Sequence, residues 1–153
     1  MVKAVIFDLD DTLIPEKQYI ESGYRYIAEI LSKKLRVSPE KIFNDLLSLF
    51  NRNPKYVFDR LLDAYKIDYT SEIIQDIVAG YRNHLPNICF YDDVIPCLRD
   101  LKSKDMKLGI ITDGYANTQQ QKLKAVNAHD YFDEIIITDE FGQEFRKPHP
   151  KAF

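Results

Sequence analysis

The chain has 153 residues, of which 45% are hydrophobic and 29% charged, and its formal net charge is -3. These values are typical of an ordinary globular domain. No basic cluster with interleaved aromatic residues suggests nucleic-acid binding, and no apolar run is long enough to cross a bilayer. Without a signal-like start or a disulfide-dense pattern, we expect a cytoplasmic protein in which Cys89 and Cys97 are buried and unpaired.

The first predicted element is a strand at residues 3–7, an apolar run that is too short for a helix and typical of a buried parallel strand. Asp8, Asp10 and Asp11 follow it directly. In an open α/β sheet, ligands bind at the carboxyl ends of the strands. Two acids spaced two residues apart at that edge can place one carboxylate on a hard cation and another on a substrate.

The next segment predicts four helices without a strand between them. Apolar residues recur at steps of three and four over residues 17–35, and helix start signals follow at Ser38-Pro39, at Asn53-Pro54 and at Thr70 or Ser71. This pattern fits a small helical bundle over residues 15–90. The segments at 14–17 and 85–91 should join it to the rest of the chain, and the second should act as a hinge.

The remaining residues alternate between helix and strand. Asp92 or Asp93 should cap a helix that runs to about residue 104, followed by a strand at 107–112, a helix at 117–125 and a strand at 133–138. This order predicts a parallel sheet with right-handed crossovers. Residues 1–14 and 91–153 should therefore form one α/β domain, into which the bundle is inserted.

Three short motifs occur at the ends of predicted strands or soon after one. They are DLDDTL at residues 8–13, Thr112-Asp113-Gly114, and Lys147 in KPHPKAF. In this order they resemble the first three motifs of the haloacid dehalogenase-like (HAD) superfamily, and residues 8–13 match its first pattern, DxDx[TV][LV], at every position. The resemblance implies an α/β, Rossmann-like core with a parallel sheet and an inserted α-helical cap.

The resemblance also implies catalytic roles. Asp8 would be the nucleophile that forms an aspartyl phosphate and a ligand of Mg²⁺, while Asp10 would act as general acid and base and bind the metal through its backbone carbonyl. The Thr112 hydroxyl, the Asp113 and Gly114 amides and Lys147 would hold the phosphate. An acid at position 10 argues against carbon–halogen cleavage.

Each of these residues also has a purely structural interpretation. Strand-end acids often cap the next turn, and Thr-Asp-Gly is a common turn sequence. Asp11 is expected to be solvated or capping, and the three histidines show no metal-ligand spacing. A weaker hypothesis is that Tyr19, Ser22 and Gly23 contribute to substrate choice. The alternative is that they pack in a core, as aromatic residues at helical spacing usually do.

We therefore expect a magnesium-dependent phosphomonoester hydrolase acting on a small phosphorylated metabolite, although phosphomutases share these motifs. The family's fourth, acidic motif does not occur in these 153 residues, so we expect a core that is truncated at its C-terminus. The alternative is a catalytically incompetent fragment or the N-terminal module of a larger HAD-like protein. The first strand would then be an exposed edge, so we expect either self-association through it or a longer parent chain, with no nucleic-acid or membrane partner.

Overall fold

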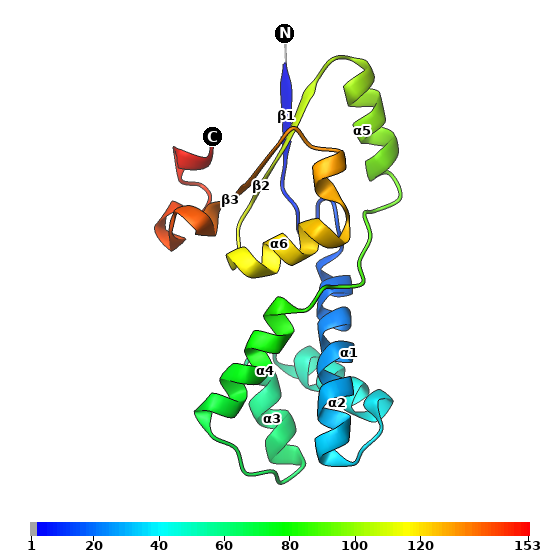
Figure 1. Cartoon of the computed structure of the whole chain (residues 1–153), viewed down its shortest axis with the longest axis vertical. Helices are drawn as coiled ribbons and strands as arrows, with labels where there is room; N and C mark the ends of the chain where they lie inside the picture. Colours follow the sequence, from blue (N-terminus) through cyan, green and yellow to red (C-terminus); the bar gives the residue numbers. More distant parts are fainter. Residues whose placement is uncertain (1–2) are drawn as a thin grey trace. The chain divides into compact units, whose positions relative to one another are not determined.

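The computed structural model describes residues 3–153, and the chain divides into two compact units (Figure 1). The sheet unit combines the residues up to Tyr19 with Leu85–Phe153, whereas the helical unit is continuous from Ile20 to His84. The predicted range of 15–90 for the bundle extends beyond the helical unit at both ends. Within residues 3–153, no helix is both long and apolar enough to cross a membrane.

Three parallel strands form the sheet, in the order β1-β2-β3. They are β1 (Ala4–Phe7), β2 (Lys107–Thr112) and β3 (Glu134–Ile137). Phe7 pairs with Ile110, and Thr112 pairs with Ile137. The central strand β2 is buried from Leu108 to its end, as an apolar strand with neighbours on both edges should be. This arrangement is the predicted α/β, Rossmann-like fold.

The first strand, β1, is an exposed edge, as expected for a core without the fourth motif, and is not the buried strand that its apolar run predicts. No residue of β1 is fully buried, and Ile6 is 50% exposed. Within residues 3–153, β1 has a strand neighbour on one edge only. Water therefore reaches the side chains and backbone groups of its other edge. The buried apolar residues of this segment come after the strand, at Leu9, Leu13 and Ile14.

Two helices connect the strands. Helix α5 (Val94–Ser103) precedes β2, and α6 (Ala116–Ala125) runs from β2 toward β3 through a short 3-10 turn, η1 (Ala128–Asp130). After β3 the chain forms three further 3-10 turns, drawn in orange to red in Figure 1: η2 (Thr138–Phe141), η3 (Gln143–Phe145) and η4 (Pro150–Ala152). Because the strands are parallel, all three carboxyl ends lie at one edge of the sheet.

The helical unit contains the four predicted helices. They are α1 (Glu16–Leu35, from Ile20 on), α2 (Pro39–Arg52), α3 (Val57–Ala64) and α4 (Ser71–Asn83). Helix α2 begins as predicted, because the Ser38 hydroxyl accepts a hydrogen bond from the Lys41 N–H and Pro39 occupies the first turn. Helix α3 begins at Val57 rather than at Pro54. The Asn53 side chain accepts the Lys55 N–H instead, in the turn that ends α2.

Aromatic rings hold α1 against α4. The Tyr24 ring lies 5.6 Å from the Tyr81 ring, and Phe58 packs edge-on against both. Gly23 makes the close approach possible, since a Cβ at this position would lie 2.3 Å from Cε2 of Tyr81. His84 is 5% exposed; one ring nitrogen bonds the Tyr81 carbonyl, and the other bonds the Ser22 hydroxyl. These contacts give Ser22 and Gly23 packing roles within the helical unit.

The prediction that both cysteines are buried is also wrong. Cys89 and Cys97 are exposed and free. On α5, the helical repeat directs Val94 and Leu98 into the core, which leaves the intervening Cys97 on the outer side. The N–H of Cys89 donates to Oε1 of Gln18 at 2.9 Å. The Tyr91 N–H donates to the Leu13 carbonyl. The two bonds therefore join the predicted linker at 85–91 to the residues on either side of the predicted linker at 14–17.

Candidate active site

The acid-rich turn after β1 is built around one buried leucine. Leu9 is completely buried between Asp8 and Asp10, and its carbonyl accepts the N–H groups of Leu13 and Ile14 at 2.9 and 3.2 Å. Asp8 and Asp10, on either side of it, both stay partly exposed. The buried leucine thus anchors the turn while its two neighbouring acids remain accessible.

Asp11 has a structural role in this turn. Its backbone is left-handed, with φ of 52°, and its Oδ1 accepts the N–H of Glu16, the first residue of α1, at 2.9 Å. Aspartate tolerates this conformation better than most residues. The interpretation of Asp11 as a capping residue is confirmed.

Lys147 meets Asp8 at the carboxyl edge of the sheet. Its Nζ lies 2.5 Å from Oδ1 of Asp8 and donates a second hydrogen bond, of 3.0 Å, to the Ile111 carbonyl. The two side chains retain 28% and 43% exposure, so the pair is open to solution. The structure therefore brings the first and third motifs together across 139 residues of sequence.

Asp113 fixes the segment that carries this lysine. Its Oδ1 accepts the Thr138 hydroxyl at 2.5 Å and the Lys147 N–H at 3.1 Å. Gly114 follows with φ of +122°, and a Cβ there would lie 3.2 Å from the Gln119 side chain, so this turn requires glycine. The sequence predicted phosphate binding by the amides of Asp113 and Gly114; the carboxylate contacts of Asp113 were not predicted.

Thr112 is 1% exposed at the end of β2. Its Oγ1 accepts a hydrogen bond of 2.6 Å from Nε2 of Gln119, and it lies 3.4 Å from the Asp113 carbonyl. The hydroxyl thus belongs to a buried network within the sheet unit. Its predicted contact with a phosphate oxygen stays a prediction.

Two residues of α6 that sequence reasoning missed hold the Asp10 carboxylate. Nζ of Lys122 lies 2.7 Å from Oδ1 of Asp10, and Nε2 of Gln119 donates to Oδ2 at 2.9 Å. The Lys122 side chain is only 4% exposed, and its Nζ lies 4.5 Å from the centre of the Tyr19 ring. The sequence did contain a signal for these two contacts, namely a glutamine and a lysine three residues apart in the predicted helix that follows the second motif.

A third ion pair anchors the chain just before Lys147. Nη2 of Arg146 lies 2.8 Å from Oδ1 of Asp139, while Oδ2 accepts the Ala116 N–H at the start of α6. The hydrogen bond from Arg146 lowers the pKa of Asp139 below its ordinary value. The pair therefore ties the lysine segment to the helix that holds Asp10.

The histidines have no metal-binding arrangement. Within residues 3–153, no group of three or more His, Cys, Asp or Glu side chains could hold a metal ion. Nδ1 of His149 accepts the Lys151 N–H at the start of η4, which is the predicted helix-start role. His84 is buried in the helical unit, where desolvation lowers its pKa.

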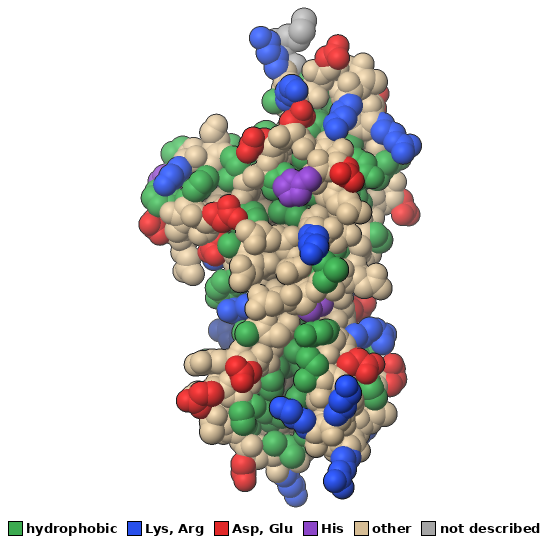
Figure 2. Space-filling view, viewed as in Figure 1, with side chains coloured by type: hydrophobic (Ala, Val, Ile, Leu, Met, Phe, Trp, Pro, Cys, Tyr) green, Lys and Arg blue, Asp and Glu red, His purple; other side chains and the backbone are tan. Residues whose placement is uncertain are grey.

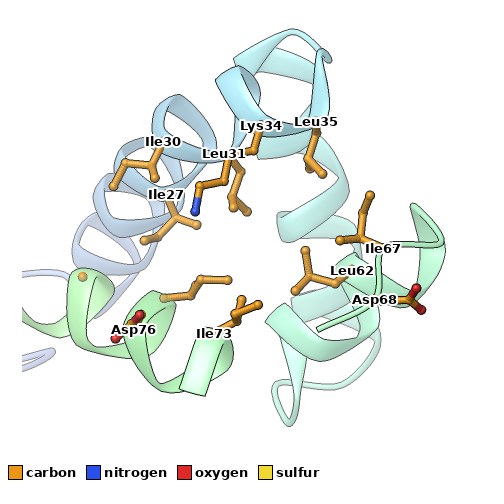
Figure 3. A pocket seen from close by; sticks show the side chains of 12 residues that line it. Ile27, Ile30, Leu31, Lys34, Leu35, Leu62, Ile67, Asp68, Ile73 and Asp76 are labelled. Carbon is orange, nitrogen blue, oxygen red and sulfur yellow. The ribbon is translucent and has the colours of Figure 1, made fainter. Parts of the chain in front are cut away.

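An apolar pocket of about 230 Å³ lies within the helical unit (Figure 3). Leucine and isoleucine side chains make up most of its wall, together with Lys34, Asp68 and Asp76. On the face seen in Figure 2, hydrophobic side chains gather over this unit. None of the motif residues lines the pocket, so it is separate from the candidate active site.

Comparison with known proteins agrees with the motif geometry. Residues 5–153 match the model of the haloacid dehalogenase-like hydrolases. The chain belongs to this family. Among solved HAD-type structures, a putative β-phosphoglucomutase from Thermotoga maritima aligns with a TM-score of 0.58 and 24% identity, over 91% of this chain and 62% of that one. At this level of identity the likeness shows the shared fold.

Curated relatives of this HAD hydrolase are phosphatases. The glyceraldehyde 3-phosphate phosphatases of Methanopyrus kandleri and Methanocaldococcus jannaschii are each 32% identical to it. Each alignment covers the whole chain and 68% of the relative. The N-acylneuraminate-9-phosphatase of Mus musculus is 28% identical over 99% of the chain and 66% of its own length. The chain thus spans about two thirds of these relatives and less than two thirds of the solved structure.

Proposed function

We propose that this HAD hydrolase is a magnesium-dependent phosphomonoesterase that acts on a small phosphorylated metabolite through an aspartyl phosphate at Asp8. The observation that carries the proposal is the contact between Asp8 and Lys147 at the carboxyl edge of the sheet. A carboxylate can approach a phosphate dianion only where cationic groups offset the repulsion between them. Lys147 supplies such a charge, and the exposure of the pair leaves room for a substrate.

The reaction has two steps. In the first, an Asp8 oxygen forms a bond to phosphorus while the bond from phosphorus to the substrate's bridging oxygen breaks, and Asp10 gives a proton to the departing alcohol. In the second, Asp10 accepts a proton from water as the water oxygen bonds to phosphorus. The bond between phosphorus and the Asp8 oxygen breaks at the same time, which regenerates the Asp8 carboxylate and frees inorganic phosphate.

The donor chemistry fits a hard cation. Mg²⁺ is commonly held by one or two carboxylates, with water and substrate phosphate completing the octahedron. Asp8 offers a half-exposed carboxylate, and Asp10 offers its backbone carbonyl because its carboxylate is engaged by α6. When bound, the cation would neutralise phosphate oxygens. The residues carrying this proposal are therefore Asp8 and Asp10 for the metal, and Thr112, Asp113, Gly114 and Lys147 for the phosphate.

The names of the relatives support the substrate class. Phosphatases of glyceraldehyde 3-phosphate and of N-acylneuraminate 9-phosphate both act on phosphorylated small molecules. Glyceraldehyde 3-phosphate is the first substrate to test, given the 32% identity. The helical unit is proposed to act as a cap for such substrates, and a cytoplasmic location stays a prediction.

Asp8→Asn tests the nucleophile. The amide keeps the shape of the side chain but cannot form the acyl phosphate, so we expect hydrolysis of an aryl phosphate with Mg²⁺ to fall by about 10⁴-fold or more. Asp11→Asn, in the same turn, is the matched control and should stay within a few-fold of the wild type, because asparagine also caps and tolerates a positive φ. Activity of Asp8→Asn close to that of the control would refute the proposal.

A further inference from the structure

Lys122 is a charged side chain in an interior position. It is 4% exposed, although lysine is almost never fully buried unless it is paired. Its partner is Asp10, at 2.7 Å, and the Tyr19 ring lies 4.5 Å from its ammonium nitrogen. A buried ion pair is weak evidence for stability alone, since apolar residues often replace such pairs without loss. The arrangement therefore calls for a reason beyond packing.

The contacts leave Asp10 fixed but accessible. Lys122 occupies Oδ1, and Gln119 occupies Oδ2 while also donating to Oγ1 of Thr112. A carboxylate has about four lone-pair sites, so two remain. The Asp10 side chain keeps 26% exposure, against 4% for Lys122. Two donors from one helix thus prevent rotation of the carboxylate and leave part of it available to a reacting group.

We propose that Lys122 and Gln119 are positioning residues that orient the Asp10 carboxylate for proton transfer, with Tyr19 covering the lysine from water. This inference rests on the proposed phosphatase function. Proton transfer requires the acid to lie within hydrogen-bond reach of the bridging oxygen, and small errors in orientation are costly. Gln119 also links Asp10 to Thr112, so the second motif and the proton-transfer group are held by the same side chain.

The test compares two substrates with different leaving groups. An alkyl phosphate releases an alkoxide that needs a proton, whereas 2,4-dinitrophenyl phosphate releases a phenolate that does not. The quantity to compare is kcat/KM, because it reports only the steps through departure of the leaving group and excludes the later hydrolysis that both substrates share. In Lys122→Met, we expect kcat/KM for the alkyl phosphate to fall about 10- to 100-fold, a partial loss of the 10²–10⁴-fold that acid–base catalysis contributes. For the dinitrophenyl ester it should fall by less than about threefold. A purely structural role would lower both rates equally.

Matched controls lie on the same helix. Lys124→Met and Gln120→Leu change neighbouring residues of α6 that are exposed, and both should leave the ratio of the two rates unchanged. Gln119→Leu should lower the rate for the alkyl phosphate selectively, as Lys122→Met does. Equal losses on both substrates, or a faster Lys122→Met enzyme, would overturn the inference and leave the phosphatase function standing. A wild type that hydrolyses neither substrate would overturn the proposed function as well.

A second readout does not depend on activity. In the wild-type background, Asp10→Asn leaves the buried ammonium of Lys122 without its counter-charge. In the Lys122→Met background there is no ammonium, so the same substitution leaves no buried charge unpaired. We therefore expect Asp10→Asn to shift the unfolding equilibrium constant at least about tenfold less in the Lys122→Met background, as for other directly coupled pairs. Additive effects of the two substitutions would show that the ion pair does not hold Asp10.

Discussion

Lys147 is held both by its side chain and by its backbone, and these contacts serve different purposes. Its ammonium bonds the carboxylate of Asp8 and the carbonyl of Ile111, while its backbone N–H is held by Asp113. The backbone contact places the residue at the edge of the sheet, and the side chain then delivers a positive charge beside the proposed nucleophile. Removal of the side chain should therefore affect anion binding more than folding.

We expect Lys147→Ala to weaken the binding of vanadate or phosphate about 10- to 100-fold, the loss of one charge-assisted contact. The free energy of unfolding should fall by less than about 1 kcal/mol, because Asp8 is half exposed and water can replace the lysine. Titration calorimetry and a thermal melt measure the two quantities. Lys151→Ala is the control on the same segment, and equal vanadate affinity in Lys147→Ala would show that Lys147 does not bind the anion.

Only part of the candidate site was predictable at the level of residues. Asp8 and Lys147 were found because their motifs combine charged residues with a fixed local pattern, and the structure brings them together. Gln119 and Lys122 were missed because a polar residue on a helix is normally solvated. Their burial depends on Asp10, which lies 112 residues from Lys122 in the sequence, and no local pattern reports such a contact.

At the scale of elements, the tight contact between α1 and α4 creates the buried environment of His84. Gly23 lets the Tyr81 ring approach α1, and the rings of Tyr81 and Tyr26 lie against the imidazole at 6.0 and 5.6 Å. Burial lowers the pKa of His84 from its ordinary value of 6.5, although the bond to the Tyr81 carbonyl acts in the opposite direction. Folding therefore favours the neutral ring.

This shift predicts a pH dependence of stability. The contribution of neutral His84 is complete above pH 6.5 and is lost as the pH falls from 6.5 through the lower pKa of the folded state, because the unfolded chain binds the proton more readily. Urea unfolding between pH 7.5 and about 5 should show this decline. His84→Asn should make the curve flatter in this window, and an unchanged slope would contradict the assignment to His84.

Most elements were predictable because each has a local cause. The strand at 107–112 and the helix starting at Pro39 have the bounds that apolar run length and a serine cap indicate. Helix α3 was misplaced because Asn53-Pro54 serves equally well to end one helix and to begin another. The choice depends on which N–H the Asn53 side chain accepts, and here it is that of Lys55. The apolar run of β1 by itself predicts burial, because exposure depends on which strands lie beside it. The exposed edge was expected only from the absence of the fourth motif in these residues.

At the scale of the whole molecule, β1 is one of the two edges of the described sheet, and it is exposed. Ile6 is 50% exposed there, and unpaired edges with apolar side chains readily pair with other strands. We expect this 153-residue chain, studied alone, to associate in a concentration-dependent way. Ile6→Lys should reduce the association, because a charge on an edge strand opposes pairing. Light scattering measures the molar mass of both proteins as a function of concentration. A wild type that stays monomeric at every concentration would contradict the prediction.

The division into two units has a consequence for the order of events during synthesis. The helical unit is one continuous stretch, Ile20–His84, whereas the sheet unit needs residues from both ends of the chain. At the usual translation rate of about 5–20 residues per second, roughly 7–28 s pass between the synthesis of Asp8 and that of Lys147. The helical unit can fold on the ribosome within that interval. In nascent chains stalled near residue 120, residues 20–84 should therefore already be protected from protease. The acid-rich turn would still lack its contact with Lys147, which has not yet been synthesised.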